Sequence, residues 1–548
     1  MKSDITDYER WSNTDGLSLR WNNRAKFAAQ FVRPGLSIVD IGCGAMAVEG
    51  IFSASSYVPC DVVQRDDRTK VIDLNAEPIP GEWFAGADVV VMLGVLEYIA
   101  DIASVLRAIF DAGKPIITSY HPTNRNPDLE ERSHTWISSC TVEEFESLIR
   151  ECGFLIQWRY AYSGNELVYF IYPSNYSKNI SDLAATADTD LFRSEHITKR
   201  PCILVAGFYG RGNCGDEALL QVIYEEFSAE YDIVISLDEH GAMPGYWDWY
   251  PYNLCNRIHQ CNLAFPARPM AGMIVGGGGL PIGFAADQIY SAKRANTPIA
   301  LVGTDYPRNA MLDSKASTIS EYNYLRMFDY IAFRSADSVA KASDIGIKAN
   351  YGADWALNLQ ADNSPDVSEN KKRVLLVVRE FPLRLAQNYY VEQIQYLHRE
   401  LCEMGYEPYF LPFCDEDDRF VRTLSLDYLM PSEVQWWNAR RVKQLIDQSG
   451  LVISIGRLHP MIFAATTQTP IIQLCPPLMQ NIDPMKFVKI AKMSKEFTTS
   501  YYESTNDVVN AVRSGIYMKG RAATVQAAKT RLAATVSALR DLFSSNSI

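Results

Sequence analysis

The sequence predicts an α/β fold of three lobes, each built on a parallel sheet. Short β-branched runs such as LVISI at 451–455 alternate with helical patterns almost throughout the chain. At 548 residues the chain is too long for one hydrophobic core, and lobes of roughly 150–200 residues are the usual solution. Polar stretches at 173–200 and 360–373 interrupt the alternation. We therefore expect a first lobe at 1–172, a linker at 173–200, and two further lobes at 201–360 and 361–548.

The overall composition excludes several classes of protein. A net charge of −13 argues against a surface that binds nucleic acid. No apolar run approaches the roughly 20 residues of a membrane span, and the first residues, MKSDITDYER, lack the features of a signal peptide. The 11 cysteines are scattered, odd in number and without a CxxC pair, which indicates reduced thiols and no metal site. We expect a cytoplasmic protein.

The first lobe opens with a strand that ends in a glycine-rich turn. Residues 37–50 read SIVDIGCGAMAVEG, a β-branched strand followed by Gly42 and Gly44 and then by a helical pattern. Glycines at the carboxyl end of a strand let the backbone approach a ligand closely. About twenty residues later, Asp61 stands at the tip of the next strand, where a carboxylate can accept the hydroxyls of a ribose. This spacing favours a nucleotide-type ligand.

Residues 8–172 resemble the class I S-adenosylmethionine-dependent methyltransferases in the segments VDIGCG, YVPCD, VIDLNAEPIP, ADVVVMLGVLEYIAD and WISSCTVEEFESLIRECGF. The resemblance implies a Rossmann-like domain that binds S-adenosylmethionine as methyl donor. It implies eight cofactor-binding residues, grouped by the methionine, ribose, adenine and sulfonium parts of the donor: Asp40, Gly42 and Gly44; Asp61; Asp73 and Leu74; Leu93 and Gly94.

Two positions of the first lobe depart from the pattern of that family. Met46 stands where a third glycine is common, and Tyr98 replaces a frequent histidine. A Rossmann-like lobe that has lost its cofactor is therefore the alternative. His121, directly after the strand-like run IITSY, is either a structural residue or a base that deprotonates an acceptor hydroxyl.

The second lobe carries two further glycine-rich turns. Residues 202–227 combine a buried-looking strand, a loop with four glycines in nine residues, and an amphipathic helix that opens with Asp216. Asp216 is either a partner of the helix dipole or a catalytic group. Residues 273–290 repeat the arrangement with four consecutive glycines. Both loops therefore predict a backbone that approaches a substrate.

The third lobe places arginines at the ends of two strands. Arg379 follows the strand-like run VLLVV, and Arg457 follows LVISI, with His459 two residues later at the start of a helix. In an open parallel sheet the ligand crevice lies at these carboxyl ends. Guanidinium groups, an imidazole and a helix N-terminus together favour an anion. The alternative is an arginine in a salt bridge and a histidine that caps its helix.

Residues 201–490 resemble the polysaccharide pyruvyltransferase family in GFYGRGNCGDEALL, VGGGGLPI, FRSADS, YGADWAL, VVREFP, FLPF and IGRLHPMIFAATTQTPII, in that order. The resemblance implies a two-lobed, GT-B-like fold with its active site between the lobes. Phosphoenolpyruvate would be the pyruvyl donor, and no metal is expected. The implied catalytic residues are His459, Arg457 and Asp216, and the implied substrate-binding residues are Arg379, Arg334, Asn213, Gly212, Gly215, Gly277 and Gly278.

The leading hypothesis is a bifunctional enzyme that pyruvylates a glycan and methylates the same glycan with its first lobe. The acceptor would be a glycan or a lipid-linked oligosaccharide, met at the inner face of the plasma membrane with peripheral association with membrane assembly machinery. The alternative is a GT-B glycosyltransferase that uses a nucleotide sugar and has an inactive methyltransferase-like domain for binding. Because Arg457 and His459 are expected on a surface turn, we expect their alanine variants to fold.

Overall fold

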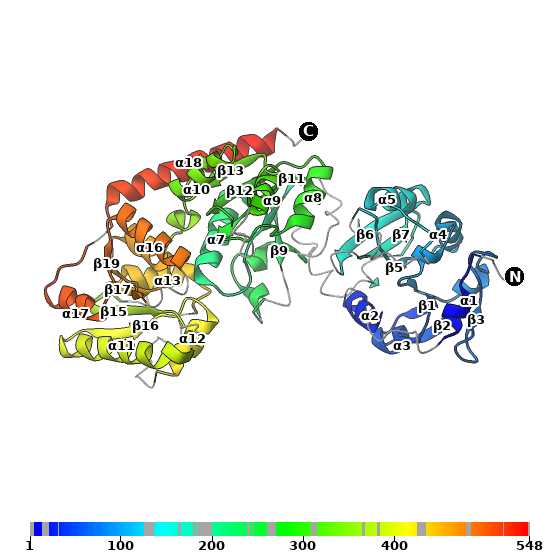
Figure 1. The fold of residues 1–548 in the computed structure, drawn as a ribbon, viewed down its shortest axis with the longest axis horizontal. Helices are drawn as coiled ribbons and strands as arrows, with labels where there is room; N and C mark the ends of the chain where they lie inside the picture. The colour runs from blue at the N-terminus through cyan, green and yellow to red at the C-terminus, as the bar shows by residue number, and fades with distance from the viewer. Residues whose placement is uncertain are drawn as a thin grey trace. The chain divides into compact units, whose positions relative to one another are not determined.

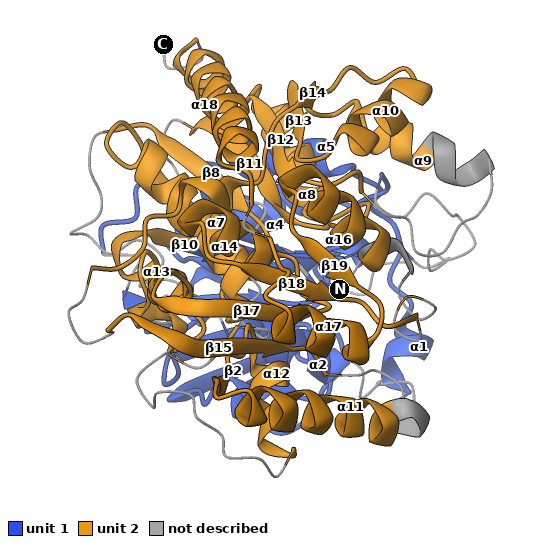
Figure 2. Cartoon of the chain, turned by 90° about the vertical axis from the view of Figure 1, so that its left-hand side faces the viewer, with its two compact units in different colours: residues 1–197, 258–267 blue, residues 198–257, 268–548 orange. Residues whose placement is uncertain are grey.

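The structure is a computed structural model of the chain. It divides into two compact units, shown in blue and orange in Figure 2: unit 1 comprises residues 1–197 and 258–267, and unit 2 comprises residues 198–257 and 268–548. The structure describes residues 5–13, 21–30, 32–124, 136–162, 166–178, 182–183, 200–237, 242–243, 245–259, 270–307, 315–363, 368–380, 384–424, 435–477, 480, 484–518 and 520–545.

The described residues of unit 1 form a seven-stranded sheet in the order β3-β2-β1-β4-β5-β7-β6 (Figure 1). Neighbours from β3 to β5 are parallel, whereas β7 runs antiparallel to both β5 and β6. The strands are β1 (Ser37–Ile41), β2 (Ser56–Asp61), β3 (Lys70–Val71), β4 (Val89–Met92), β5 (Ile116–Tyr120), β6 (Phe154–Ala161) and β7 (Leu167–Pro173). The helices are α1 (Tyr8–Ser12), α2 (Trp21–Ala29), α3 (Ala47–Ile51), α4 (Ile102–Asp111) and α5 (Val142–Glu151), with 3₁₀ turns η2 (Gly81–Phe84) and η3 (Leu96–Tyr98).

The strands of unit 1 alternate their side chains between two hydrophobic cores. In β4, Val90 and Met92 pack into the core that includes α4 and α5, whereas Val89 and Val91 pack into the core that includes α2 and α3. Successive side chains of a strand point to opposite faces, so a sheet covered on both faces reads as a continuous apolar run. The next helix, α4, begins where the Asp101 side chain accepts a hydrogen bond from its first turn.

The first lobe of unit 2 has a second seven-stranded sheet among its described residues, in the order β10-β9-β8-β11-β12-β13-β14. The pairs from β9 to β14 are parallel. The strands are β8 (Cys202–Ala206), β9 (Asp232–Leu237), β10 (Asn256–His259), β11 (Met270–Gly278), β12 (Ile299–Thr304), β13 (Tyr330–Phe333) and β14 (Asn350–Tyr351). The helices are α7 (Cys214–Phe227), α8 (Ala286–Arg294), α9 (Lys315–Leu325) and α10 (Ala336–Asp344), with η7 (Tyr246–Asp248), η8 (Tyr252–Leu254) and η9 (Trp355–Asn358).

The second lobe of unit 2 has a five-stranded parallel sheet, in the order β16-β15-β17-β18-β19. The strands are β15 (Asn370–Val378), β16 (Glu407–Phe410), β17 (Ser449–Ile455), β18 (Ile471–Leu474) and β19 (Ser500–Tyr502). The helices are α11 (Arg384–Glu403), α12 (Asp415–Arg422), α13 (Ala439–Asp447), α14 (His459–Thr467), α16 (Pro484–Phe497), α17 (Thr505–Arg513) and α18 (Ala522–Ser544).

The last helix, α18, returns from the second lobe to the first, as the red helix of Figure 1 shows. Its residue Phe543 shares a hydrophobic core with Phe227 and Tyr231 of the first lobe. Gly272 on β11 leaves room for the Phe543 ring, because a Cβ there would lie 2.2 Å from it. The helix ties the two lobes of unit 2 together, which a division of the chain at residue 361 does not anticipate.

In each of the three sheets, strand order reverses beside one pair of strands. These pairs are β1 and β4, β8 and β11, and β15 and β17. The carboxyl ends of such pairs form a crevice in which α/β proteins bind their ligands. Most of the predicted site residues lie at the carboxyl ends of β1, β8, β11, β15 and β17, or in the turns and first helical turns that follow these strands. The predicted α/β fold class is confirmed. The expectation of a purely parallel sheet fails in unit 1, where β7 runs antiparallel to β5 and β6 and makes the sheet mixed.

Two candidate functional sites

A cavity of about 470 Å³ lies at the carboxyl edge of the unit 1 sheet. A cavity of this size can hold most of a cofactor-sized ligand. The turns that follow β1, β2 and β4 supply much of its lining. All eight residues that the resemblance assigned to the cofactor line it: Asp40, Gly42, Gly44, Asp61, Asp73, Leu74, Leu93 and Gly94.

The turn after β1 has a backbone that favours glycine. Gly42 and Gly44 have φ of 75° and 50°, and a Cβ on Gly42 would lie 2.4 Å from Cγ2 of Val95. Met46 also has a left-handed φ of 55°, although it carries a side chain. The departure at Met46 therefore retains the local conformation, at a cost of about 1 kcal/mol.

Two carboxylates beside this turn, Asp40 of β1 and Asp61 of β2, differ in how they are paired. Asp40 is buried and accepts a 2.6 Å hydrogen bond from the Tyr57 hydroxyl. Burial raises the pKa of Asp40 to about 7; the Tyr57 hydrogen bond opposes this shift and the charge of Asp61 adds to it. Asp61 accepts hydrogen bonds from the Gly44 backbone at 2.9 Å and from Arg65 at 3.2 Å. A cationic ligand beside Asp40 would favour the ionised form of that carboxyl.

The N-terminal segment forms part of the cavity wall, which the sequence pattern does not predict. The hydroxyls of Thr6 and Tyr8 both donate to the Asp73 carboxylate, from Thr6 at 2.8 Å. Trp11 packs edge-on against Tyr98, with 4.9 Å between ring centroids. Helix α1 has no fully buried residue. A hydrophobic pattern therefore could not have revealed that this helix belongs to the site.

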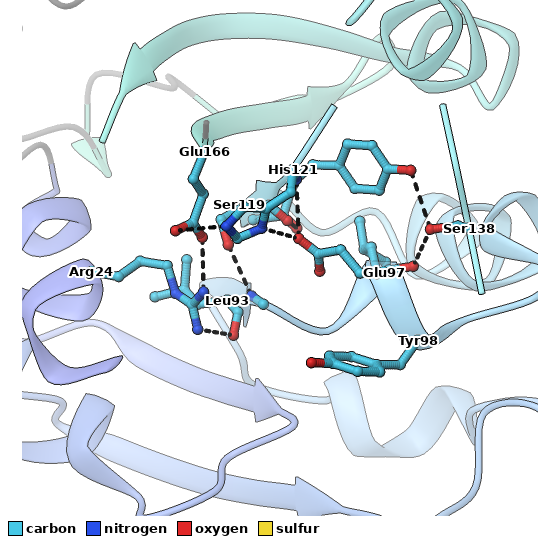
Figure 3. Close-up of polar contacts among 12 residues, drawn as sticks. Arg24, Leu93, Glu97, Tyr98, Ser119, His121, Ser138 and Glu166 are labelled. Atoms are coloured by element: carbon cyan, nitrogen blue, oxygen red, sulfur yellow. Dashed lines mark hydrogen bonds and ion pairs between the residues drawn. The ribbon is translucent and has the colours of Figure 1, made fainter. Parts of the chain in front are cut away.

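Figure 3 shows a chain of polar contacts on the wall formed after β4 and β5. The ring of His121 lies 2.8 Å from Glu97 through Nδ1 and 3.5 Å from Glu166 through Nε2. Arg24 lies 2.8 Å from Glu166 and donates a 3.0 Å hydrogen bond to the Leu93 carbonyl. Burial lowers the pKa of His121, but Glu97 and Glu166 outweigh it, so the pKa lies above its usual value.

The sequence pattern indicates one member of this group and gives no sign of the other three. His121 stood out as a lone histidine after a strand. Glu97, Glu166 and Arg24 did not, because they are up to 142 residues apart in sequence and share no motif. Glu97 lies in η3, the short 3₁₀ turn after β4, and a charged residue near the carboxyl end of that strand is the available signal.

In unit 2, a row of buried charges joins elements of both lobes. Nε2 of His459, the first residue of α14, lies 3.5 Å from Oδ2 of Asp354. Arg334 donates to Asp354 at 2.7 Å and to Asp305 at 2.7 and 3.0 Å, and Lys489 of α16 lies 3.0 Å from Asp305. Burial disfavours ionised aspartates, yet the neighbouring His459, Arg334 and Lys489 side chains hold the pKa of both Asp354 and Asp305 below its usual value. Both edges of the Arg334 guanidinium are therefore occupied within the protein.

Asp216 belongs to the same group, on the first turn of α7. Its Oδ1 lies 2.9 Å from the position that a Cβ on Gly278 would take. Burial raises the pKa of Asp216, and the charges of His459 and Arg334 oppose that shift. Helix α7 is capped by Asn213, whose side chain accepts a 3.2 Å hydrogen bond from the backbone of the first turn. Asn213 is thus the cap of the helix, and Asp216 is not. We call Asp216, Asp305, Arg334, Asp354, His459 and Lys489 the charged row.

The predicted glycines of unit 2 make room at the charged row. A Cβ on Gly215 would lie 1.8 Å from Nδ1 of His459, so only glycine lets this ring lie against α7. Gly212, Gly277 and Gly278 have φ of 66°, 95° and 68°, in the left-handed region that favours glycine. The loops after β8 and β11 can therefore turn sharply beside the row. Contact between these glycines and a substrate remains a prediction.

Arg457 and Arg379 lie at the ends of neighbouring strands. Nη2 of Arg457 lies 2.5 Å from Asp417 and 2.7 Å from the Cys414 sulfur. Its Nε is buried and has no hydrogen-bond partner among the described residues. Cδ of Arg379 lies 3.8 Å from the position that a Cβ on Gly456 would take, next to Arg457.

The expectation of a surface turn at Arg457 and His459 is wrong. The side chains of Arg457 and His459 are only 14% and 12% exposed, and the partner carboxylate of Arg457, on Asp417, is fully buried. Asp417 lies on α12, and no motif of the sequence pairs it with Arg457. The salt bridge that is the alternative role of Arg457 is present. Because the pair is buried, removal of the arginine should destabilise the fold.

Two further properties concern the described part of the chain. No group of three or more His, Cys, Asp and Glu side chains within it could hold a metal ion. None of its helices is long and apolar enough to cross a membrane.

Comparison with known proteins gives one family match. Residues 213–473 match the family described as polysaccharide pyruvyl transferase. No curated protein matches the chain in sequence.

Solved structures resemble separate parts of the chain. Human N-acetylserotonin methyltransferase in complex with SAM is 16% identical over 31% of this chain, with a TM-score of 0.24, and the chain covers 56% of its length. A putative UDP-N-acetylglucosamine 2-epimerase from Listeria monocytogenes is 9% identical over 57% of this chain and 87% of its own, with a TM-score of 0.39. The UDP-GlcNAc 2-epimerase from Methanocaldococcus jannaschii is 11% identical over 57% of this chain and 92% of its own, with a TM-score of 0.39.

The matched residues include most of the charged row. Asp216, Asp305, Arg334, Asp354 and His459 all fall within 213–473, as do Arg379, Arg457 and Asp417. They come from both lobes of unit 2 and meet where two parallel sheets present their carboxyl ends. Unit 2 of this chain therefore contains a polysaccharide pyruvyl transferase domain, and the chain is an enzyme.

Proposed function

We propose that unit 2 transfers the pyruvyl group of phosphoenolpyruvate to two hydroxyls of a glycan, which forms a cyclic ketal. The observation that carries the proposal is the position of His459 and Asp216 beside Arg457, buried at the carboxyl edges of both sheets and within the matched residues. Two acid–base groups beside a guanidinium suit a reaction that moves protons next to a phosphorylated, carboxylated donor.

Cations at two neighbouring strand ends support an anion site. Phosphoenolpyruvate carries a carboxylate and a phosphate, and guanidinium groups match both in a bidentate manner. Arg457 and Arg379 follow the paired strands β17 and β15. The salt bridge to Asp417 holds Arg457 in one position, and the buried Nε of Arg457 is a donor to which no described residue is hydrogen-bonded. A bound anion would satisfy that donor.

Asp216 and His459 suit the two proton transfers of the reaction. Because burial raises the pKa of Asp216, its carboxyl retains a proton more readily than an exposed aspartate. In the proposed reaction, Asp216 gives that proton to the methylene carbon, a sugar oxygen bonds to C2, and His459 accepts the hydroxyl proton. The bond between C2 and the phosphate oxygen then breaks, and His459 returns its proton to the phosphate. A second hydroxyl closes the ketal, and its proton restores Asp216.

For unit 1 we propose S-adenosylmethionine as the ligand of the cavity, with the same glycan as acceptor. The cavity volume, the absence of space for a Cβ at Gly42, and a buried carboxyl at Asp40 that can ionise opposite a cationic ligand all fit this molecule. When bound, it supplies a methyl group. The residues that would hold it are Asp40, Gly42 and Gly44 around the methionine part, Asp61 at the ribose, Asp73 and Leu74 at the adenine, and Leu93 and Gly94 near the methyl group.

Two transferases on one chain gain from a shared acceptor. Linkage raises the local concentration of a glycan that both units modify. A lipid-linked acceptor would bring the protein to the inner face of the plasma membrane by peripheral association. We therefore propose a lipid-linked glycan as the acceptor and the inner face of the plasma membrane as the location.

Calorimetric titration of the wild type and Arg457→Lys with phosphoenolpyruvate and S-adenosylmethionine tests the proposal. Lysine retains a positive charge opposite Asp417 but lacks the planar fork of arginine. We expect the wild type to bind both ligands, and the variant to lose at least about tenfold in affinity for phosphoenolpyruvate only. Binding of UDP without binding of phosphoenolpyruvate would replace this proposal with the glycosyltransferase alternative.

A further inference from the structure

The unit 1 cavity has a histidine and two carboxylates that the proposed cofactor positions do not use. Figure 3 shows His121 between Glu97 and Glu166. The side chains of Glu97 and Glu166 are 1% and 5% exposed, and that of His121 is 19% exposed toward the cavity that all three line. Burial of two carboxylates is costly unless they are paired with donors or cations. Here the groups that pair with them are the imidazole and Arg24.

The contacts of Glu97 fix the orientation of the imidazole. One oxygen of Glu97 accepts a hydrogen bond from the His121 backbone N–H at 3.1 Å and lies 2.8 Å from Nδ1 of the same residue. In the neutral ring, a proton on Nδ1 leaves the lone pair on Nε2. Nε2 lies 3.5 Å from Glu166, which is too long for a strong hydrogen bond. A base with one nitrogen held by a carboxylate is ready to accept a proton at the other.

This group is anchored to the strand end that lies near the proposed methyl group. Arg24, paired with Glu166, donates to the Leu93 carbonyl at 3.0 Å. A Cβ on Gly94 would lie 2.4 Å from Nη2 of Arg24, so the arginine lies directly against this glycine. The base and the end of β4 therefore hold fixed positions relative to each other.

Aromatic rings surround the same part of the cavity. The Trp136 ring lies 4.7 Å from the His121 ring, between centroids. Trp11, Tyr98 and Tyr162 also line the cavity. Aromatic faces pack against the apolar face of a sugar ring, and carboxylates accept hydrogen bonds from its hydroxyls. The lining therefore suits a hydroxylated ring.

We propose that His121 is the general base of an O-methylation in unit 1, with a sugar hydroxyl as the nucleophile and Glu97 as the residue that positions the base. This inference rests on the proposed function of unit 1. Nε2 of His121 takes the hydroxyl proton, and the hydroxyl oxygen bonds to the methyl carbon. The bond from methyl carbon to sulfur breaks, and its electron pair stays on sulfur. The positive charge thus passes from the sulfonium of the donor to the imidazole of His121, which becomes an imidazolium.

Three variants of the full chain test this role: His121→Asn, Glu97→Gln, and His398→Asn as a matched control on α11 of unit 2. Binding of S-adenosylmethionine is measured by calorimetry. The protonation of the histidine rings is followed by NMR titration, with His121 assigned from the spectrum of its variant. Methyl transfer is measured from radiolabelled S-adenosylmethionine to a set of methyl pyranosides.

We expect His121→Asn to bind S-adenosylmethionine within about twofold of the wild type and to lose about 10²–10⁴-fold in methyl transfer. Glu97→Gln should lower the pKa of the His121 ring and reduce transfer by at least about tenfold. The control should match the wild type in all three measurements.

The possible outcomes separate this inference from the function on which it rests. A wild type that does not bind S-adenosylmethionine overturns the proposed function of unit 1. If the wild type binds S-adenosylmethionine and His121→Asn transfers methyl groups as fast as the wild type, only the role of His121 as the base is overturned. Binding without methylation of any pyranoside overturns the sugar acceptor, and an unchanged pKa of His121 in Glu97→Gln overturns the positioning role.

Discussion

His121 and His459 occupy similar places in the two units but have different surroundings. Each follows a parallel strand at its carboxyl end, and each faces a buried carboxylate. His121 lines a cavity of about 470 Å³. His459 lies in a row in which Arg334 already binds Asp305 and Asp354.

This difference shows that a candidate site can be recognised either by its cavity or by its charged residues. In unit 1, the volume of the cavity at the end of the sheet limits the size of a ligand, and the lining residues suggest its chemistry. In unit 2, the cations are engaged with the protein's own carboxylates, so an incoming anion must add to existing pairs or compete with them. The family match, and the Arg457 Nε to which no described residue is hydrogen-bonded, then give more of the support for a function.

The largest expected effect separates the two histidines. His459→Asn should reduce pyruvyl transfer from phosphoenolpyruvate by about 10²–10⁴-fold, because it removes an acid–base group. Binding of S-adenosylmethionine in unit 1 should not change. Phosphate release and calorimetry measure the two properties, and His398→Asn serves as the control. Equal loss of both properties would mean that the substitution disturbs the fold instead.

Removal of Arg457 tests how strongly unit 2 depends on its internal pairs. Arg457→Ala leaves the fully buried Asp417 without its cation, which should lower the free energy of unfolding of unit 2 by about 3–5 kcal/mol. Urea denaturation measures this change. The double variant Arg457→Met, Asp417→Leu removes both charges and should recover much of the loss. If the double variant is no more stable than Arg457→Ala, the pair is not the cause.

Gly215→Ala tests the close contact between the lobes at His459. The added Cβ would lie 1.8 Å from Nδ1 of His459, so the ring must move. We expect pyruvyl transfer to fall by about 10–100-fold, since small displacements of a catalytic group have effects of this size. Gly50→Ala is the matched control, because Gly50 is also helical and has no atom within 4 Å of its Cβ position. Steady-state kinetics of both variants distinguishes a local displacement from a general effect of alanine.

The smallest expected effect concerns Asp40 and pH. Its pKa of about 7 in the free protein means that Asp40 is largely protonated below pH 7. A cationic ligand binds the ionised form better, so the affinity for S-adenosylmethionine should rise by up to about tenfold per pH unit and level off above about pH 7.

Calorimetry between pH 5 and 8 measures this dependence on Asp40. The titratable groups near Asp40 are Tyr57, Asp61, Cys43 and Cys60. Asp40→Asn should weaken binding and abolish the pH dependence, whereas His121→Asn should retain it. If the affinity of Asp40→Asn for S-adenosylmethionine still depends on pH, another group is responsible for the titration.

Stability should change with pH in the opposite direction. The folded state holds the Asp40 proton more tightly than the unfolded state does. This contribution to stability is therefore present below pH about 4 and is lost as the pH rises toward 7. Thermal unfolding of the wild type and Asp40→Asn across this range checks the sign.

The sequence by itself determined the class of fold, and it placed most of the predicted site residues at the ends of strands. Alternating strands and helices predicted three parallel sheets, and the glycine-rich turns predicted their ligand edges, because these signals are local in the chain. The eight cofactor positions line one cavity, and Asp216 and His459 meet in unit 2. Motifs at strand ends carry this information, since strand order brings those ends together.

Only the tertiary structure decided which groups each site residue contacts. Glu97, Glu166 and Arg24 surround His121, and Asp417 neutralises Arg457, although no spacing in the sequence links these residues. The same holds for helix α18, which returns to the first lobe of unit 2. Contacts between distant segments depend on how whole elements pack, and burial then decides whether a charge is exposed, paired or shifted in pKa.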